Sequence, residues 1–221
     1  MTVYHGFDIT IRPTTPTEIP QAATILAEAY NQDIFFKWCV PNDKTRAKIV
    51  ADYYKVYLRA KGCISHIAEI PEFSETPETP ESSESPAPQK TKIIATTIWL
   101  PHDTDPSIYE EIERVVGSEN APMFREVAER SHANEPQNTP FYQLVGFGVL
   151  KEFQGKGIGC ALLKHHIDIL DKKGIPTYLE ASTPYHGGGV YGKFNYKQFG
   201  ELMFFTDTAV LYPLFRPAKK A

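Results

Sequence analysis

Apolar and polar residues follow two different periods along this chain, which divide it into candidate strands and candidate helices. Short stretches with alternating or nearly continuous apolar residues are typical of strands. They cover residues 7–13, 63–70, 92–101, 141–150, 176–183, 197–205 and 208–217. Longer stretches whose apolar residues recur at helical spacing predict helices. These cover residues 17–30, 42–62, 105–131, 154–174 and 190–194.

Local signals suggest where several of these helices begin and end. Thr17 is a candidate N-cap for the first helix, and Asn42 or Asp43 for the second, because short polar side chains accept hydrogen bonds from free amides there. Gly62 would stop the second helix. Pro122 would stand near the start of a second helix within residues 105–131, a position that proline tolerates. The pattern therefore predicts one or two helices in that stretch.

A strand, a helix and a second strand follow one another between residues 141 and 183. Such a unit predicts a right-handed parallel crossover. The strands at residues 63–70 and 92–101 are expected to pair as a hairpin with an overlong connection. Together these elements predict an α/β protein with a mixed sheet.

The connection within that hairpin, residues 71–90, is acidic and rich in proline and serine. It holds five glutamates and one lysine, a net charge of −4 that equals the net charge of the whole chain. With few apolar residues it has no core to offset chain entropy, so we predict a disordered acidic loop inserted into a single domain spanning residues 1–221. An acidic docking arm is the alternative interpretation.

Composition narrows the class of protein. At 221 residues the chain is long enough for one sizeable domain, and a net charge of −4 argues against a nucleic-acid surface. No run of eighteen apolar residues and no signal-peptide pattern is seen, so we expect no membrane contact. The three scattered cysteines lack metal-type spacing and indicate reduced thiols in a cytoplasmic protein without a metal site. A monomer or weak homodimer is expected.

The stretch "QGKGIG", residues 154–159, sets glycines between a strand and a helix, a place that suits a phosphate. It does not match the P-loop, because Lys156 is followed by Gly157 and not by Ser or Thr. It nearly matches the dinucleotide pattern GxGxxG, with Cys160 at the third glycine and Glu180 at the distance of a ribose-binding acid. That fold needs several parallel strands, however, and only one such unit is visible.

A third pattern, Gln/Arg-x-x-Gly-x-Gly/Ala, is satisfied by Gln154, Gly157 and Gly159. The stretch "VGFGVLKEFQGKGIGCALL" is followed by "YLEAST" and "VYGKFNYKQFGE". With these motifs in this order, the sequence resembles the GCN5-related N-acetyltransferase (GNAT) superfamily over most of its length. The resemblance implies a mixed, mostly antiparallel central sheet flanked by helices. It also implies a parallel β-α-β unit that carries an acetyl-CoA site.

The glycine-rich turn suits the pyrophosphate of acetyl-CoA, because amides at a helix start attract anions and glycines allow close approach. By resemblance, the preceding strand splays from its parallel neighbour at a bulge, and the pantetheine arm pairs with it there. Gly146 and Gly148 fit a bulge or a close backbone approach. Lys151 stands where the family often has proline. The predicted cofactor residues are Phe147, Gly148, Val149, Leu150, Gln154, Gly155, Lys156, Gly157, Ile158, Gly159, Cys160, Ser182 and Tyr191.

The resemblance implies transfer of an acetyl group to the primary amine of a small molecule by direct attack in a ternary complex. The amine must be neutral to attack, so a base and an acid are expected. Tyr191 matches the tyrosine of the family's Y-x-x-x-G-F stretch and is the predicted acid, although it could simply pack the short helix. Asn195 replaces the glycine of that stretch. Glu180 is the predicted base, because a carboxylate within an apolar strand is costly unless it faces a wet cleft or a partner.

The acceptor pocket is predicted from residues near the end of the first helix. Asp33 is a second candidate base by resemblance, or else a helix cap. Aromatic residues, among them Tyr30, Phe36 and Trp99, would line the pocket and favour a small, partly apolar amine, or they would belong to the core. Two other functions stay open: a non-catalytic CoA- or acyl-CoA-binding protein on the same fold, and a dinucleotide-binding oxidoreductase.

Overall fold

A computed structural model describes residues 2–4, 7–72, 90–184 and 189–219. Its strands form a single path in the order β1-β2-β3-β4-β5-β6-β9-β7, with β8 paired to β9. The strands are β1 (Thr2–Tyr4), β2 (Phe7–Pro13), β3 (Ile64–Pro71), β4 (Thr91–Pro101), β5 (Tyr142–Val149), β6 (Thr177–Ala181), β7 (Lys197–Gln198), β8 (Met203–Phe204) and β9 (Val210–Arg216).

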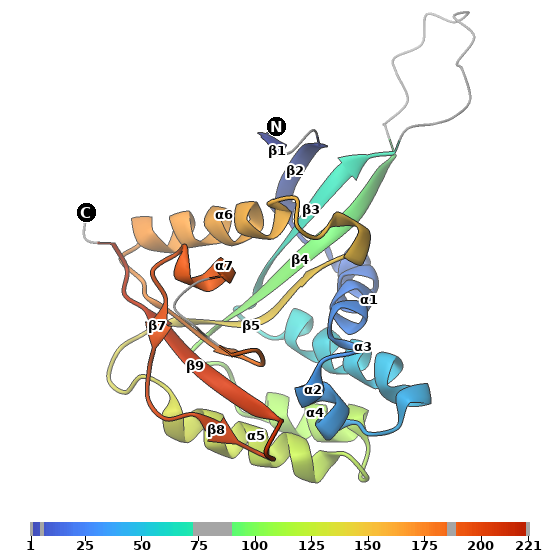
Figure 1. Ribbon diagram of the computed structural model, residues 1–221, viewed down its shortest axis with the longest axis vertical. Helices are drawn as coiled ribbons and strands as arrows, with labels where there is room; N and C mark the ends of the chain where they lie inside the picture. The colour runs from blue at the N-terminus through green and yellow to red at the C-terminus, as the bar shows by residue number, and fades with distance from the viewer. Residues whose placement is uncertain (1, 5–6, 73–89, 185–188, 220–221) are drawn as a thin grey trace, which may run out of the picture.

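Helices cover both faces of this sheet, as Figure 1 shows. They are η1 (Pro16–Glu18), α1 (Ile19–Tyr30), α2 (Ile34–Cys39), α3 (Asp43–Arg59), α4 (Ser107–Val116), α5 (Ala121–Asn134), η2 (Lys151–Phe153), α6 (Ile158–Lys172) and α7 (Gly189–Gly192). Helix α6 packs on one face, with α7 beside it, and α1 and α3 pack on the other with α4 and α5 beyond them. The fold is the mixed α/β arrangement that the sequence predicted.

Alternation along β4 divides the core between the two faces. Ile98 and Leu100 join the buried cluster of α1 and α3, whereas Trp99 between them joins the cluster of α6. Both sets are almost fully buried. A strand that is apolar on both faces is typical of a sheet covered by helices on both sides.

The predicted parallel crossover is confirmed. All strand pairs described are antiparallel except β5 and β6, which α6 connects. Their pairing ends at Leu144 and Leu179, although β5 continues to Val149. At the same point the register of β5 against β4 skips Val145, because Ile98 faces Gly146 and Trp99 faces Leu144. The bulge turns β5 away from β6, as the resemblance implied.

The glycines of β5 allow a helix to approach closely. A Cβ atom on Gly148 would lie 3.1 Å from Leu26 Cδ2 and 3.2 Å from Ala29 Cβ. One on Gly146 would lie 3.1 Å from the ring of Tyr54. Contacts this short are tighter than ordinary packing, so β5 brings α1 near the splayed part of the strand.

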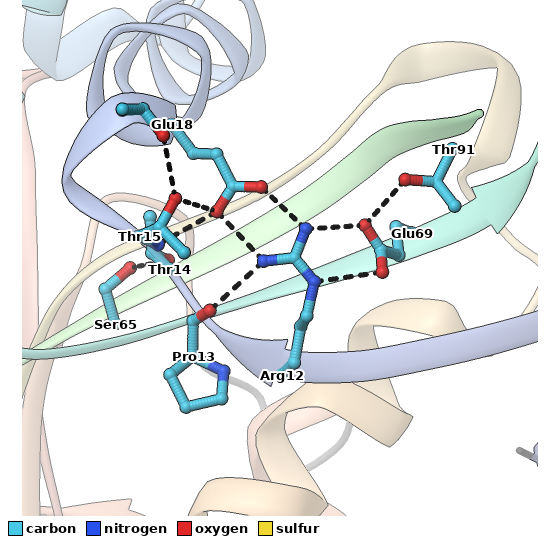
Figure 2. Close-up of polar contacts among 9 residues, drawn as sticks. Arg12, Pro13, Thr14, Thr15, Glu18, Ser65, Glu69 and Thr91 are labelled. Atoms are coloured by element: carbon cyan, nitrogen blue, oxygen red, sulfur yellow. Dashed lines mark hydrogen bonds and ion pairs between the residues drawn. The ribbon is translucent and has the colours of Figure 1, made fainter. Parts of the chain in front are cut away.

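A polar network fixes the start of α1 to the sheet. Figure 2 shows the Arg12 guanidinium of β2 between two carboxylates, Glu18 of η1 and Glu69 of β3. Arg12 donates to Glu18 at 2.6 and 2.9 Å and to Glu69 at 2.8 and 2.9 Å. Thr91 adds a bond of 2.9 Å to Glu69. Hydrogen bonding from Arg12 lowers the pKa of Glu18 to about 2, so the carboxylate is charged at neutral pH.

Three local predictions differ from the structure. Thr17 is not the cap of the first helix: it lies within η1, whose N-cap is Thr15, and the N-cap of α1 is Glu18. The predicted strand 197–205 is two short strands, β7 and β8, because Gly200 adopts a positive φ of 66° between them. The sequence also missed α2, a helix of six residues that is too short to show a period.

The predicted acidic loop lies almost entirely outside the described residues, which stop at Glu72 and resume at Lys90. The strands on either side of it, β3 and β4, pair as the predicted antiparallel hairpin. Among the helices in the described part of the chain, none has the length and apolar character needed to cross a membrane.

Candidate active site

The glycine-rich turn forms the start of α6. Gly155 and Gly157 have φ values of 74° and 79°, in the left-handed region that glycine adopts without strain. The first helical hydrogen bond runs from Ala161 N to Gly157 O. The amides of Ile158, Gly159 and Cys160 therefore precede the bonded part of the helix and have no helical carbonyl to bond.

This turn fits the phosphate group for which it was predicted. A Cβ atom on Gly155 would meet nothing within 4 Å, so the outer side of the turn is open. Gln154 closes the inner side, because its Nε2 donates to Val149 O at 2.9 Å. The first amides of α6 and the positive end of its dipole thus follow an open turn and lie near the splayed end of β5.

Gly159 has a different role from the two glycines before it. A Cβ atom there would lie 2.8 Å from Phe147 Cζ, too close for any side chain without movement of the ring. Gly159 is therefore required for packing of α6 on β5, and it places the phosphate turn next to Phe147.

A cavity of about 760 Å³ opens on the other side of the splay. Below, this cavity is called the chamber. Its walls come from α1 to α5, the ends of β4, β5 and β6, and α7. The lining side chains include Tyr30, Asp33, Phe36, Tyr53, Tyr57, Leu100, His102, Tyr109, Phe124, Ser131, Glu135, Val145, Phe147, Glu180, Ser182 and Tyr191.

One wall of the chamber is a chain of aromatic rings from α1 to α5. The ring of Tyr30 lies 5.3 Å from that of Phe36, and Phe36 lies 6.0 Å from Tyr53. Tyr53 in turn lies 4.9 Å from Tyr57 and 5.0 Å from Phe124. The wall is apolar on its ring faces and carries phenol hydroxyls, so it suits a flat or cationic group.

Glu180 lies on the opposite wall, on the face of β6 that looks toward α5. Its Oε1 accepts from the Tyr178 hydroxyl at 2.9 Å, and its Oε2 accepts from Ser131 Oγ at 2.7 Å. Burial, with a smaller contribution from the nearby Glu135, raises the pKa of Glu180 to about 7. Burial also raises the pKa of Glu135. A carboxyl group that titrates near neutral pH is suited to accept and release protons.

Asp33 accepts hydrogen bonds from residues on two sides of the chamber. Its Oδ1 accepts from the amides of Phe35 and Phe36 at 2.9 and 3.3 Å, which caps α2. Its Oδ2 accepts from Ser182 Oγ at 2.6 Å, across 149 residues of sequence. The capping interpretation of Asp33 is thus confirmed, although the helix that it caps is α2. Both predicted residues, Asp33 and Ser182, also line the chamber.

Tyr191 lines the chamber from α7, with its ring 6.4 Å from that of Phe147. Burial raises the pKa of Tyr191 well above its ordinary value, with a smaller contribution from Tyr30, so the phenol keeps its proton at neutral pH. The turn after α7 holds Asn195 at a φ of 63°, a left-handed conformation that asparagine tolerates better than most residues other than glycine. Tyr191 therefore brings a protonated phenol close to the splay.

The prediction for Trp99 is wrong. Trp99 is 0% exposed and does not line the chamber. Its ring stacks on His166 of α6, with centroids 4.3 Å apart and planes 13° apart. The reason is the alternation of β4, which turns Leu100 toward the chamber and Trp99 toward α6. The other predicted pocket residues, Tyr30, Asp33 and Phe36, do line it.

Sequence reasoning missed the residues that α3 and α5 contribute. Tyr53 and Tyr57 are spaced for one face of α3, and Ala128 and Ser131 are spaced for one face of α5, with Glu135 as its C-cap. This spacing is equally typical of core or solvent faces, so the sequence held no signal that these faces meet. The contact of Ser131 with Glu180 arises only from tertiary packing.

The parallel β5–α6–β6 unit ends its strand pairing at a bulge, with the glycine-rich turn on one side and the chamber on the other. Residues 70–187 match the model of a family described as the acetyltransferase (GNAT) family. The chain therefore belongs to the GNAT acetyltransferase family.

Solved structures share this fold at low sequence identity. A Corynebacterium glutamicum protein described as histone acetyltransferase HPA2 and related acetyltransferase is 17% identical, with a TM-score of 0.63 over 96% of this chain and 98% of that chain. Arylalkylamine N-acetyltransferase 2 from Aedes aegypti is 11% identical, with a TM-score of 0.59 over 96% and 100%. FeeM, an N-acyl amino acid synthase from uncultured soil microbes, is 11% identical, with a TM-score of 0.55 over 96% and 92%. No curated protein sequence matches the chain.

Proposed function

We propose that this protein is an acetyl-CoA-dependent N-acetyltransferase that acetylates the primary amine of a small molecule. One observation carries the proposal. The open end of the β5–β6 pair lies between the anion-binding turn of α6 and a chamber that contains both Glu180 and Tyr191. A thioester donor and an amine acceptor could meet there from opposite sides.

Acetyl-CoA would supply an activated acetyl group as a thioester. The amides at the start of α6 would hold its pyrophosphate, with Gly155 and Gly157 giving the turn its shape. Beyond Leu144, none of the described strands pairs with the edge of β5 that faces β6, so main-chain groups from Phe147 to Leu150 would pair with the pantetheine arm. Of the residues predicted to bind the donor, Ser182 bonds to Asp33 and is given no role in this assignment.

Glu180 is proposed as the base. An alkylamine is largely protonated at pH 7 and must lose a proton before it can attack a carbonyl carbon. With a pKa of about 7, Glu180 accepts that proton and can release it again to water. Its two hydroxyl partners hold the carboxylate in a defined orientation.

Tyr191 is proposed as the acid. The departing thiolate needs a proton, and the Tyr191 phenol is protonated at neutral pH. Its place beside Phe147, at the end of the chamber nearest the splay, supports this role.

The chamber lining supports a small cationic amine with an apolar body as the acceptor. It includes the carboxyl groups of Asp33, Asp103, Glu135 and Glu180, and no lysine or arginine occurs among the described residues of the lining. The aromatic wall offers an apolar surface for the rest of the molecule. The Aedes aegypti protein of similar fold is named for activity on arylalkylamines, which is compatible with this acceptor class.

A two-part experiment tests the proposal. Thermal shifts with acetyl-CoA, CoA, NAD and ATP should show stabilisation by the two CoA compounds alone. A panel of primary amines should then release free thiol from acetyl-CoA with the wild type and far less with Glu180→Gln. Stabilisation without thiol release on any amine would favour a non-catalytic CoA-binding protein, and stabilisation by NAD alone would contradict the proposal.

A further inference from the structure

Tyr30, the last residue of α1, makes a polar contact in addition to its ring contacts in the aromatic wall. Its hydroxyl oxygen accepts a hydrogen bond from the amide of Phe147 at 3.4 Å. Phe147 lies beyond Leu144, the last residue of β5 that pairs with β6. The phenol therefore stands at a main-chain donor in the open part of the splay.

Packing holds this phenol in place. The ring of Tyr30 stacks on Tyr54 at 5.7 Å with planes 26° apart, and it contacts Phe36 at 5.3 Å. Burial raises the pKa of Tyr30 to about 12, with a smaller contribution from Asp33. The hydroxyl thus keeps its proton at neutral pH and can act as a donor as well as an acceptor.

Tyr30 and Tyr191 approach the same end of the chamber. Both line it, and the Tyr30 phenol contributes to the raised pKa of Tyr191. The Phe147 amide donates to one of these residues, and the Phe147 ring contacts the other. Two phenols and one main-chain amide, all able to donate, therefore lie near one another at the end of the chamber beside the splay.

We propose that Tyr30 is a catalytic residue whose hydroxyl, together with the Phe147 amide, binds the carbonyl oxygen of the acyl donor and stabilises its developing negative charge. This inference rests on the proposed function. The carbonyl oxygen replaces the phenol oxygen as acceptor of the Phe147 amide, and Tyr30 turns its own proton toward the same oxygen. At 3.4 Å the present bond is long and weak, so little energy is lost in the exchange.

The reaction balances with these groups in place. The amine nitrogen bonds to the thioester carbon while the carbonyl π pair moves to oxygen, where Tyr30 and Phe147 donate. When the carbonyl forms again, the carbon–sulfur bond breaks with its electrons on sulfur. Tyr191 gives a proton to sulfur, Glu180 takes one from nitrogen, and both exchange with water afterwards. Donors fixed before the reaction are the most effective at such an oxygen.

The test uses Tyr30→Phe, which keeps the ring and removes the hydroxyl. Tyr212→Phe is the matched control, because Tyr212 is a half-buried tyrosine of β9 outside the lining of the chamber. We expect Tyr30→Phe to lower kcat about 100-fold, the typical effect of losing one such donor, with KM for acetyl-CoA changed less than about 3-fold. Tyr212→Phe should retain wild-type kcat.

A second readout does not depend on turnover. Isotope-edited infrared spectra of carbonyl-labelled acetyl-CoA should show a band at lower wavenumber on the wild type than in solution, and Tyr30→Phe should lose part of that shift. Bound acetyl-CoA with the same band on both proteins would overturn the role of Tyr30 and leave the proposed function intact. Failure of the wild type to bind acetyl-CoA would overturn both. A raised KM for the amine with unchanged kcat and band would make Tyr30 a wall residue only.

Discussion

Acid should weaken the fold through two histidines that meet between the sheet and α6. His66 of β3 and His166 of α6 are 4% and 0% exposed, with their Nδ1 atoms 3.2 Å apart. One ring must donate and the other accept, so the two rings cannot both be protonated, and when both are neutral they are opposite tautomers. Protonation of both rings would place two donors face to face and break the bond.

The size of the effect follows from the pKa values. Burial lowers the pKa of His66 to about 4, with a contribution from His165, and that of His166 to about 3, with contributions from His66 and His165. An unfolded histidine titrates near pH 6.5. The unfolded chain therefore binds protons that the folded chain excludes, so stability is complete above pH 6.5 and falls as the pH drops toward 4. At pH 5, about 1.5 pH units below the unfolded pKa, each ring costs about 2 kcal/mol.

Glu180 acts in the opposite direction. Its folded pKa of about 7 lies above the ordinary value of 4.5, so the folded chain binds a proton that the unfolded chain does not. Stability from this group grows as the pH falls from 7 toward 4.5, by about 2 kcal/mol at pH 5 before water in the chamber is considered. The wild type should therefore lose only about 2 kcal/mol between pH 7 and pH 5, half the histidine effect.

A single variant isolates the histidine contribution. His166→Gln retains a hydrogen-bonding group for His66 but cannot titrate. The stability of the wild type relative to this variant should fall by about 2 kcal/mol between pH 7 and pH 5, because all other groups cancel in the difference. Urea unfolding at pH 7, 6 and 5, followed by tryptophan fluorescence and circular dichroism, measures it.

His132→Gln is the control, since the His132 side chain is 83% exposed. Because His132 also contacts Glu135 at 3.4 Å, the stability of this variant should follow the wild type within about 1 kcal/mol at every pH. A difference between the wild type and His166→Gln that stays constant within about 0.5 kcal/mol from pH 7 to pH 5 would refute the reasoning, because the pair would then accept protons without unfolding.

Three substitutions test other parts of the structure. Glu180→Gln should lower kcat/KM at least about 100-fold and abolish the rise of activity through pH 7 that deprotonation of a base with a pKa of about 7 produces. Gly159→Ala should lower stability by about 1–3 kcal/mol and raise KM for acetyl-CoA, because its Cβ would lie 2.8 Å from Phe147 Cζ. Arg12→Met should cost about 3 kcal/mol in urea unfolding, because it leaves the buried carboxylate of Glu69 without its cation.

Each of the three substitutions has a control variant or an outcome that would contradict the prediction. Glu28→Gln removes an exposed carboxylate of α1 outside the chamber lining and should keep the wild-type pH profile. A higher melting temperature for Gly159→Ala would show that α6 has room beside β5. Lys48→Met breaks an exposed ion pair with Asp52 and should change stability by less than about 1 kcal/mol. If Arg12→Met changed stability as little as Lys48→Met, the carboxylate of Glu69 would have to be solvated in the folded protein.

The sequence by itself determined the local structure of the glycine-rich turn, which is the proposed binding site for the pyrophosphate of acetyl-CoA. The turn at residues 154–159 and the start of α6 depend on positive φ at glycine and on a helix that begins nearby, and neither requires distant residues. The period of the apolar residues likewise predicted the β5–α6–β6 unit, and with it the crossover. The sequence also indicated Glu180 as a candidate site residue, because a carboxylate in an apolar strand must face a cleft or a partner.

Only the tertiary structure decided which faces enclose the chamber. Strand β4 is apolar on both faces, so its sequence could not show that Leu100 meets the chamber while Trp99 meets α6. The bond between Asp33 and Ser182 spans 149 residues, and no local pattern reports a contact at that separation. The chamber is built from such distant contacts, whereas the glycine-rich turn is built from consecutive residues. For this reason the turn could be predicted from the sequence, and the chamber depended on the packing of α1 to α5 and α7 against a splayed sheet.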